Sequence, residues 1–205
     1  MQKYVINDDG TTNIEIRQNG ISLSKHVDSK NFYEALTRSL RQSGCNFKSG
    51  QLPKDTISIS ESLESTSVTV FIPKRKRTML TSDGVFLNVG NPAYIMRFTY
   101  SNEIINKTQI CAVVADSTED LNESTIIYRF PFGNMLGELD ACTGSITVAA
   151  NCPMDVVDAI KTFWKSTFNG ETNPGALPLI KSLENKDFSD VLLVNSEIGS
   201  LKKLL

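Results

Sequence analysis

The chain has 205 residues, of which 40% are hydrophobic and 21% charged, a composition that is ordinary for a soluble globular protein. Its formal net charge of −2, from 21 basic and 23 acidic residues, provides no global electrostatic basis for binding nucleic acid or an anionic membrane. The N-terminal residues lack an apolar core of signal-peptide length, and no apolar run approaches the roughly 20 residues that span a bilayer. We therefore expect a cytoplasmic protein.

The chain is expected to divide into an N-terminal β-hairpin extension, residues 1–27, and a main domain, residues 28–205. Short strands are predicted over residues 3–6, 13–17 and 21–23, because the dipeptides Asp9-Gly10 and Asn19-Gly20 between them are typical of tight turns. A helix is predicted to begin at Ser29 and to end at Gly44, since apolar residues repeat between them at helical spacing.

The middle of the chain predicts an antiparallel β-meander followed by a helix. The apolar β-type runs are residues 57–59, 68–72, 78–80, 85–87, 94–98, 110–114 and 125–130. The basic run at residues 74–77 is interpreted as a solvated turn, with a docking patch for an acidic partner as the alternative. A helix beginning at Pro153 carries an apolar stripe in which Trp164 is expected to anchor the core. Residues 191–194 are expected to close a sheet edge.

The four cysteines, Cys45, Cys111, Cys142 and Cys152, are widely spaced and form no Cys-x-x-Cys pair. With His26 as the single histidine, neither a zinc site nor any other metal or cofactor site is expected. Disulfides are not expected in a reducing compartment. Cys111 lies within an apolar run and is interpreted as core filling.

A glycine-rich stretch at residues 131–144 separates the last strand of the meander from a second β-type run at residues 145–149. Its proline and glycines break any regular periodicity, so an ordered loop is expected. The stretch contains the thiol of Cys142 and, eight residues earlier, the carboxamide of Asn134. A nucleophile and a hydrogen-bond donor on one compact loop suit acyl transfer. The alternative is a crossover loop with a buried cysteine that performs no chemistry.

This spacing resembles the active-site flap of ubiquitin-conjugating enzymes, in which a His-Pro-Asn tripeptide precedes the catalytic cysteine. The local sequence, with Phe132 and Gly133 before Asn134 and Thr143 and Gly144 after Cys142, is more similar to prokaryotic ubiquitin-conjugating-like family D, which includes PRTRC system protein B. The aromatic helix at residues 163–168 also fits that family. Phe132 and Gly133 stand where the eukaryotic motif has His and Pro, so the sequence leaves open how the loop is braced.

The resemblance implies an α+β ubiquitin-conjugating-enzyme-like fold, an antiparallel β-meander flanked by helices, here with the N-terminal β extension. Cys142 would accept the C-terminus of a ubiquitin-like protein as a thioester, and Asn134 would donate its amide to the oxyanion formed on transfer. Gly144 and Thr143 would contact the carried tail. Asp140 is interpreted as an exposed loop acid, with steering of an incoming ammonium group as the alternative. Cys152 is the rival nucleophile, because a thiolate is favoured at a helix start.

The resemblance also implies partners: a ThiF-like activating enzyme, a ubiquitin-like protein and a JAB-type metallopeptidase, as in plasmid-borne or antiphage conjugation systems. A lone cysteine suits thioester exchange better than hydrolysis, because a hydrolase needs a base and nothing in the sequence brings His26 to Cys142. The second hypothesis is a catalytically inactive variant of the same fold that acts as a protein-binding adaptor.

Overall fold

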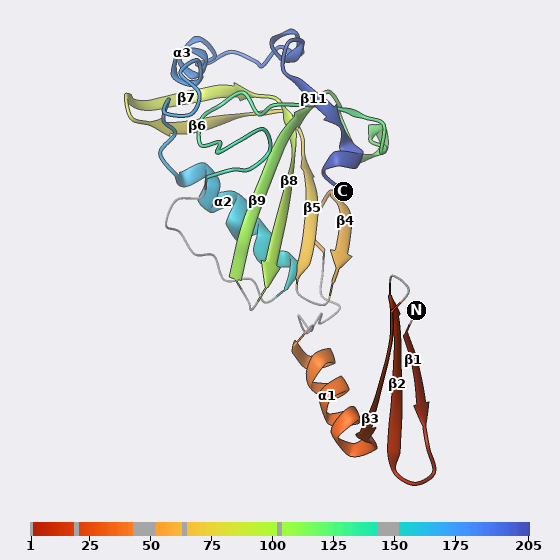
Figure 1. The fold of residues 1–205 in the computed structure, drawn as a ribbon. Helices are drawn as coiled ribbons and strands as arrows, with labels where there is room; N and C mark the ends of the chain where they lie inside the picture. Colours follow the sequence, from red (N-terminus) through yellow and green to blue (C-terminus); the bar gives the residue numbers. More distant parts are fainter. Residues whose placement is uncertain (1, 19–20, 43–51, 63–64, 102–103, 143–151) are drawn as a thin grey trace. The chain divides into compact units, whose positions relative to one another are not determined.

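The computed structural model describes residues 2–18, 21–42, 52–62, 65–101, 104–142 and 152–205 (Figure 1). The chain forms two compact units, Met1–Gly44 and Cys45–Leu205. The helix that follows the first strands belongs to the first unit, so this division differs from the boundary at residues 27/28 that the sequence suggested. No helix in the described ranges is long and apolar enough to cross a membrane.

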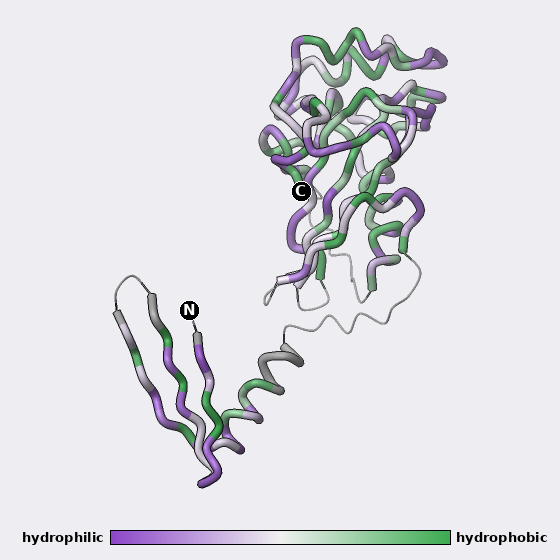
Figure 2. The backbone as a smooth tube through the Cα atoms, turned by 90° about the vertical axis from the view of Figure 1, so that its right-hand side faces the viewer, coloured by the Kyte–Doolittle hydropathy of each residue, from purple (hydrophilic) through white to green (hydrophobic). Residues whose placement is uncertain are grey.

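The N-terminal unit is an antiparallel sheet, in the order β1-β2-β3, followed by a helix. Its elements are β1 (Gln2–Ile6), β2 (Thr11–Gln18), β3 (Ile21–Asp28) and α1 (Ser29–Gln42). The predicted turn at Gly10 is present, with φ of +80°. Hydrophilic and hydrophobic residues alternate in β2, over residues 13–17 (Figure 2). Helix α1 packs on the sheet through the rings of Phe32 and Tyr4, whose centres lie 5.3 Å apart. β3 is longer than predicted, while the predicted turn at Asn19-Gly20 lies outside the described residues.

The second unit is built on a six-stranded antiparallel sheet in the order β11-β10-β9-β8-β5-β4. Its strands are β4 (Thr56–Glu61), β5 (Thr66–Ile72), β8 (Ala93–Ser101), β9 (Ile104–Val113), β10 (Ile126–Tyr128) and β11 (Glu197–Ser200). The four strands β4, β5, β8 and β9 form the expected meander, interrupted by the separate hairpin of β6 (Arg75–Thr81) and β7 (Gly84–Asn91). The architecture is therefore mixed α and β, with antiparallel sheets and few helices.

Helix α2 (Val156–Lys165) covers one face of this sheet, with α3 (Ala176–Ser182) following it in the chain (Figure 1). The buried residues of α2 lie at helical spacing, as predicted, and Trp164 is a core residue. The indole Nε1 of Trp164 donates to the hydroxyl of Tyr94 on β8 at 2.8 Å. Phe163 and Phe168 extend the aromatic cluster in edge-on contact at 5.5 Å. α2 ends at Lys165, however, five residues before the predicted glycine stop.

Two predictions about local structure were wrong. Residues 74–77 are not a turn, because Arg75 begins β6 and the basic side chains contact the chain's own acids and aromatic rings. Lys74 pairs with Asp190 at 2.7 Å, while the guanidinium of Arg77 lies 4.4 Å from the ring centre of Trp164. Residues 191–194 do not close the sheet either: Asp190–Leu193 is a 3-10 helix, and β11 closes the sheet against β10.

Candidate functional site

The stretch that precedes Cys142 is a tight hairpin, which we call the flap and define as residues 134–142. The amide of Cys142 donates to the carbonyl of Asn134 at 2.7 Å, and the amide of Leu136 donates to the carbonyl of Asp140 at 2.8 Å. Met135 and Ala141 form a bridge between these two pairs. The eight-residue spacing of Asn134 and Cys142 is therefore the spacing of two residues that face each other across a hairpin.

The flap is attached to the edge of β9. The amide of Ile110 donates to the carbonyl of Leu139 at 2.8 Å, and the amide of Ala141 donates to the carbonyl of Thr108 at 2.9 Å. Leu139 is buried in the apolar cluster on that side of the sheet. Because backbone hydrogen bonds and an apolar anchor hold one arm of the flap, the position of Cys142 is set by the main sheet.

The Asn134 side chain points to the end of α2. Its Nδ2 donates to Ser166 Oγ and to the carbonyl of Thr167, each at 3.1 Å, and the residue is only 8% exposed. Its backbone has φ of +63°, in the left-handed region that asparagine tolerates better than most residues. Both amide N–H groups expected to serve an oxyanion are thus bonded within the protein. Ser166 lies 32 residues from Asn134, and nothing in the sequence indicated this contact.

Phe132 and Gly133 stand where the eukaryotic motif has His and Pro, and they hold the loop through packing contacts. Phe132 is fully buried, with ring contacts of 5.5 Å to Phe130 and 6.3 Å to Phe188. Gly133 packs directly on the backbone at Asn169, since a Cβ at Gly133 would lie 2.1 Å from the Asn169 carbonyl oxygen. An apolar anchor and a close backbone contact therefore hold the loop that leads into the flap.

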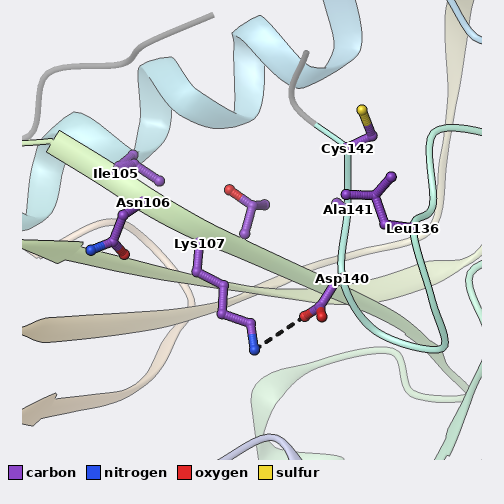
Figure 3. A pocket seen from close by; sticks show the side chains of 8 residues that line it. Ile105, Asn106, Lys107, Leu136, Asp140, Ala141 and Cys142 are labelled. Atoms are coloured by element: carbon purple, nitrogen blue, oxygen red, sulfur yellow. Dashed lines mark ion pairs between the residues drawn. The ribbon is translucent and has the colours of Figure 1, made fainter. Parts of the chain in front are cut away.

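The Cys142 side chain is half-buried and lines an open pocket of about 300 Å³ (Figure 3). The other lining residues come from β9 and the flap: Ile105, Asn106, Lys107, Thr108, Leu136, Asp140 and Ala141. Leu136 is 69% exposed beside the pocket. Asp140 Oδ1 accepts from Lys107 Nζ and from Gln109 Nε2, each at 3.2 Å. Cys142 is therefore part of the wall of a cavity whose other lining residues are both apolar and charged.

The remaining predicted site residues and cysteines are distributed differently. Thr143, Gly144 and Cys45 lie outside the described residues. Cys152 is half-buried, just before a 3-10 helix at Pro153–Asp155, and its amide donates to Asp155 Oδ2 at 3.0 Å. Cys111 is fully buried on β9, as the sequence predicted, and this burial raises the pKa of its thiol to about 12.

His26 is an exposed residue of β3, where its Nδ1 contacts Asn13 Oδ1. It belongs to the N-terminal unit, whereas Cys142 belongs to the second unit. In the parts of the chain that the structure describes, no group of three or more His, Cys, Asp or Glu residues could hold a metal ion.

Alkylation should distinguish the thiols. In the folded protein at pH 8, iodoacetamide is expected to modify Cys142 at least about 10-fold faster than Cys111, because Cys111 is buried and its raised pKa keeps it protonated. The ratio is expected to fall towards one in denaturant, as measured by peptide mass mapping. Equal rates in the folded protein would contradict this description of the site.

Residues 32–197, most of the chain, match the sequence model of the family described as Prokaryotic E2 family D. The match begins within α1 and includes the whole flap. No curated protein and no solved structure is a significant match to this chain.

Proposed function

The chain belongs to prokaryotic E2 family D, and on that premise we propose that it is a ubiquitin-like protein conjugating enzyme with Cys142 as its nucleophile. Cys142 accepts the C-terminal acyl group of a ubiquitin-like protein from a ThiF-like activating enzyme and transfers it to a target. A JAB-type metallopeptidase is the proposed partner for removing the tag. A bacterial antiphage or plasmid-borne system is the proposed setting.

The observation that carries this proposal is the position of Cys142. The residue is half-buried on the wall of an open pocket, at the end of a hairpin that backbone hydrogen bonds attach to β9. Thioester exchange moves the acyl group from the sulfur of one thiol to that of another of similar energy, so the nucleophile needs correct placement and a free approach more than a neighbouring base. Cys111 has no such approach, because it is fully buried.

In this proposal Asn134 first serves to position the flap. Its backbone carbonyl accepts from Cys142 while its side chain bonds to Ser166 and Thr167, so it connects the thiol to the end of α2. Donation to an oxyanion requires Asn134 to release one of these two side-chain bonds during transfer. We propose that Asn134 releases its bond to the Ser166 hydroxyl. This hydroxyl also donates to the Phe163 carbonyl, so it keeps a partner when the Asn134 bond is lost.

One observation favours the second candidate, a catalytically inactive adaptor of the same fold. Both N–H groups of the Asn134 amide are bonded within the protein, so no side-chain donor of this residue faces the thiol. Losing an oxyanion donor typically lowers the rate of acyl transfer by about 10²–10³-fold. An adaptor needs the flap only as a surface and has no use for the thiol.

Reconstitution tests the proposal. The wild-type chain is mixed with the proposed partners, a ThiF-like activating enzyme and a ubiquitin-like protein, with and without ATP. The expected result is an ATP-dependent adduct that a thiol reductant removes and that peptide mapping assigns to Cys142. If the activating enzyme becomes charged but no adduct forms on this chain, the result would contradict the proposal and favour the adaptor.

A further inference from the structure

Arg77 is half-buried on β6, whereas the other residues of the basic run at 74–77 are exposed. Its guanidinium lies 4.4 Å from the ring centre of Trp164, and its Nη2 donates to the Tyr94 hydroxyl at 2.7 Å. Its Nε is buried without a hydrogen-bond partner, and no carboxylate pairs with Arg77 among the described residues. Arg77 is therefore a cation that the fold holds against aromatic side chains.

Such a cation is unfavourable if its side chain only fills space. Removing a charge from water without an opposite charge beside it lowers stability, and an apolar side chain would avoid this penalty. The guanidinium adds attraction to the face of an indole, which is stronger where water is excluded, and a directed hydrogen bond. Trp164 Nε1 donates to the same Tyr94 hydroxyl at 2.8 Å, so Arg77, Tyr94 and Trp164 form one connected cluster.

The chain that leaves α2 is attached to β6 at two points (Figure 1). The first is the contact of Arg77 with Trp164. The second is Phe168, whose amide donates to the Leu80 carbonyl at 2.8 Å and whose carbonyl accepts from the Ser82 amide at 3.2 Å. The short segment between these two points is therefore held at both ends by the same strand.

The flap is bonded to this same segment. Asn134 Nδ2 donates to Ser166 Oγ and to the Thr167 carbonyl, each at 3.1 Å. The Asn134 carbonyl in turn accepts from the Cys142 amide at 2.7 Å. A continuous series of contacts thus connects Arg77 on β6 to the backbone of Cys142.

We infer that Arg77 is a positioning residue for Cys142. It holds Trp164, and Trp164 fixes the segment to which the Asn134 side chain is bonded. The inference rests on the proposed function and goes beyond it, because it gives a residue of the basic run a role in the site. A misplacement of about 1 Å at a reacting group can lower a rate by about 10²-fold, so a small shift at the end of α2 matters to the thiol.

Hydrogen exchange measured by NMR on the full-length protein tests the connection without any partner. Arg77→Met keeps an unbranched side chain but removes the charge, and is expected to raise the exchange rate of the Cys142 amide about 5- to 10-fold. The reference is the Phe71 amide, which donates to the Asp55 carbonyl at 2.9 Å and belongs to β5, separated from β9 by β8. Equal acceleration of both amides would indicate general destabilisation and overturn the inference.

Three further variants separate the cation from the space it fills. Lys76→Met removes the neighbouring cation, which pairs with Asp187 at 3.2 Å, and is expected to leave the Cys142 amide within about 2-fold of the wild type. Arg77→Lys keeps a cation for the indole face and is expected to stay within about 3-fold. Tyr94→Phe removes the shared hydroxyl and should accelerate exchange about 3- to 5-fold, even if Arg77→Met does not fold. Wild-type exchange in Arg77→Met would mean that Arg77 only fills space.

A double-mutant cycle tests whether the connection passes through Asn134. Asn134→Gly removes the carboxamide, and glycine accepts the φ of +63° at this position. In this background Arg77→Met is expected to change exchange of the Cys142 amide by less than about 2-fold, because the link to α2 is already lost. A full 5- to 10-fold effect in the Asn134→Gly background, on the same scale as above, would overturn the inference.

Single-turnover loading from the charged activating enzyme tests the consequence for the reaction, at a temperature where every variant is folded. Arg77→Met is expected to lower the maximal rate about 10-fold and to leave the half-saturating enzyme concentration within about 2-fold. A raised half-saturating concentration with an unchanged maximal rate would assign Arg77 to partner binding and overturn the inference. If the wild-type chain is not loaded at all, the proposed function fails, while hydrogen exchange still decides whether Arg77 holds the flap.

Discussion

Replacing Cys142 by alanine is expected to lower ATP-dependent loading of the ubiquitin-like protein by at least about 10³-fold, because removal of a covalent nucleophile leaves no atom to accept the acyl group. The measurement is the thiol-sensitive adduct on a non-reducing gel. Cys142→Ser is expected to give an adduct that resists thiol reductants, since an oxygen ester would replace the thioester. Neither change should disturb the fold, because the side chain is half-buried at a pocket wall.

The control for this prediction is Cys152→Ala, the other half-buried cysteine among the described residues. It is expected to retain loading within about 2-fold, because its thiol is not part of the pocket at the flap. Loss of loading in Cys152→Ala with full loading in Cys142→Ala would identify Cys152 as the nucleophile and contradict the proposed function.

Replacing Gly133 by alanine is expected to lower the free energy of unfolding by about 3 kcal/mol and to reduce loading together with it. The added Cβ would lie 2.1 Å from the Asn169 carbonyl oxygen, and the atoms it meets are backbone atoms that cannot turn aside. The loop that leads into the flap must therefore move. For a domain of this size the expected fall in Tm is about 6–12 °C, measured by thermal unfolding.

Gly137→Ala is the matched control for Gly133→Ala. Gly137 lies four residues later, within the flap, and a Cβ there would meet nothing within 4 Å. The expected change in the free energy of unfolding is within about 0.5 kcal/mol. Equal Tm values for the two variants would mean that the contact between Gly133 and Asn169 does not brace the loop.

Much of the local structure could be predicted because the signals are local. Strand alternation, the turn at Gly10 and the apolar stripe of α2 each depend on residues within one turn or hairpin of each other. The two wrong predictions have the opposite cause. Basic residues of the 74–77 run contact acids far along the chain: Lys74 pairs with Asp190, 116 positions later, and Lys76 pairs with Asp187. No local pattern contains these pairings.

The candidate site likewise has local features that the sequence predicts and long-range contacts that it does not. The spacing of Asn134 and Cys142 predicted two residues at one loop, and the hairpin hydrogen bonds explain that spacing. The direction of the Asn134 amide could not be predicted, since its partners Ser166 and Thr167 follow 32 and 33 residues later. Lys107 reaches the pocket from β9 only because the flap pairs with that strand.

By itself the sequence determined the family, most of the strands and helices, and which loop contains the thiol. These features depend on composition, on periodicity and on short spacings, all of which survive in an extended chain. Only the tertiary structure decided that Cys111 is sealed while Cys142 opens into a pocket, and that an ion pair lies beside that thiol. Burial and electrostatic contact are properties of residues that approach each other in space, so they arise only when the sheet and the flap have closed.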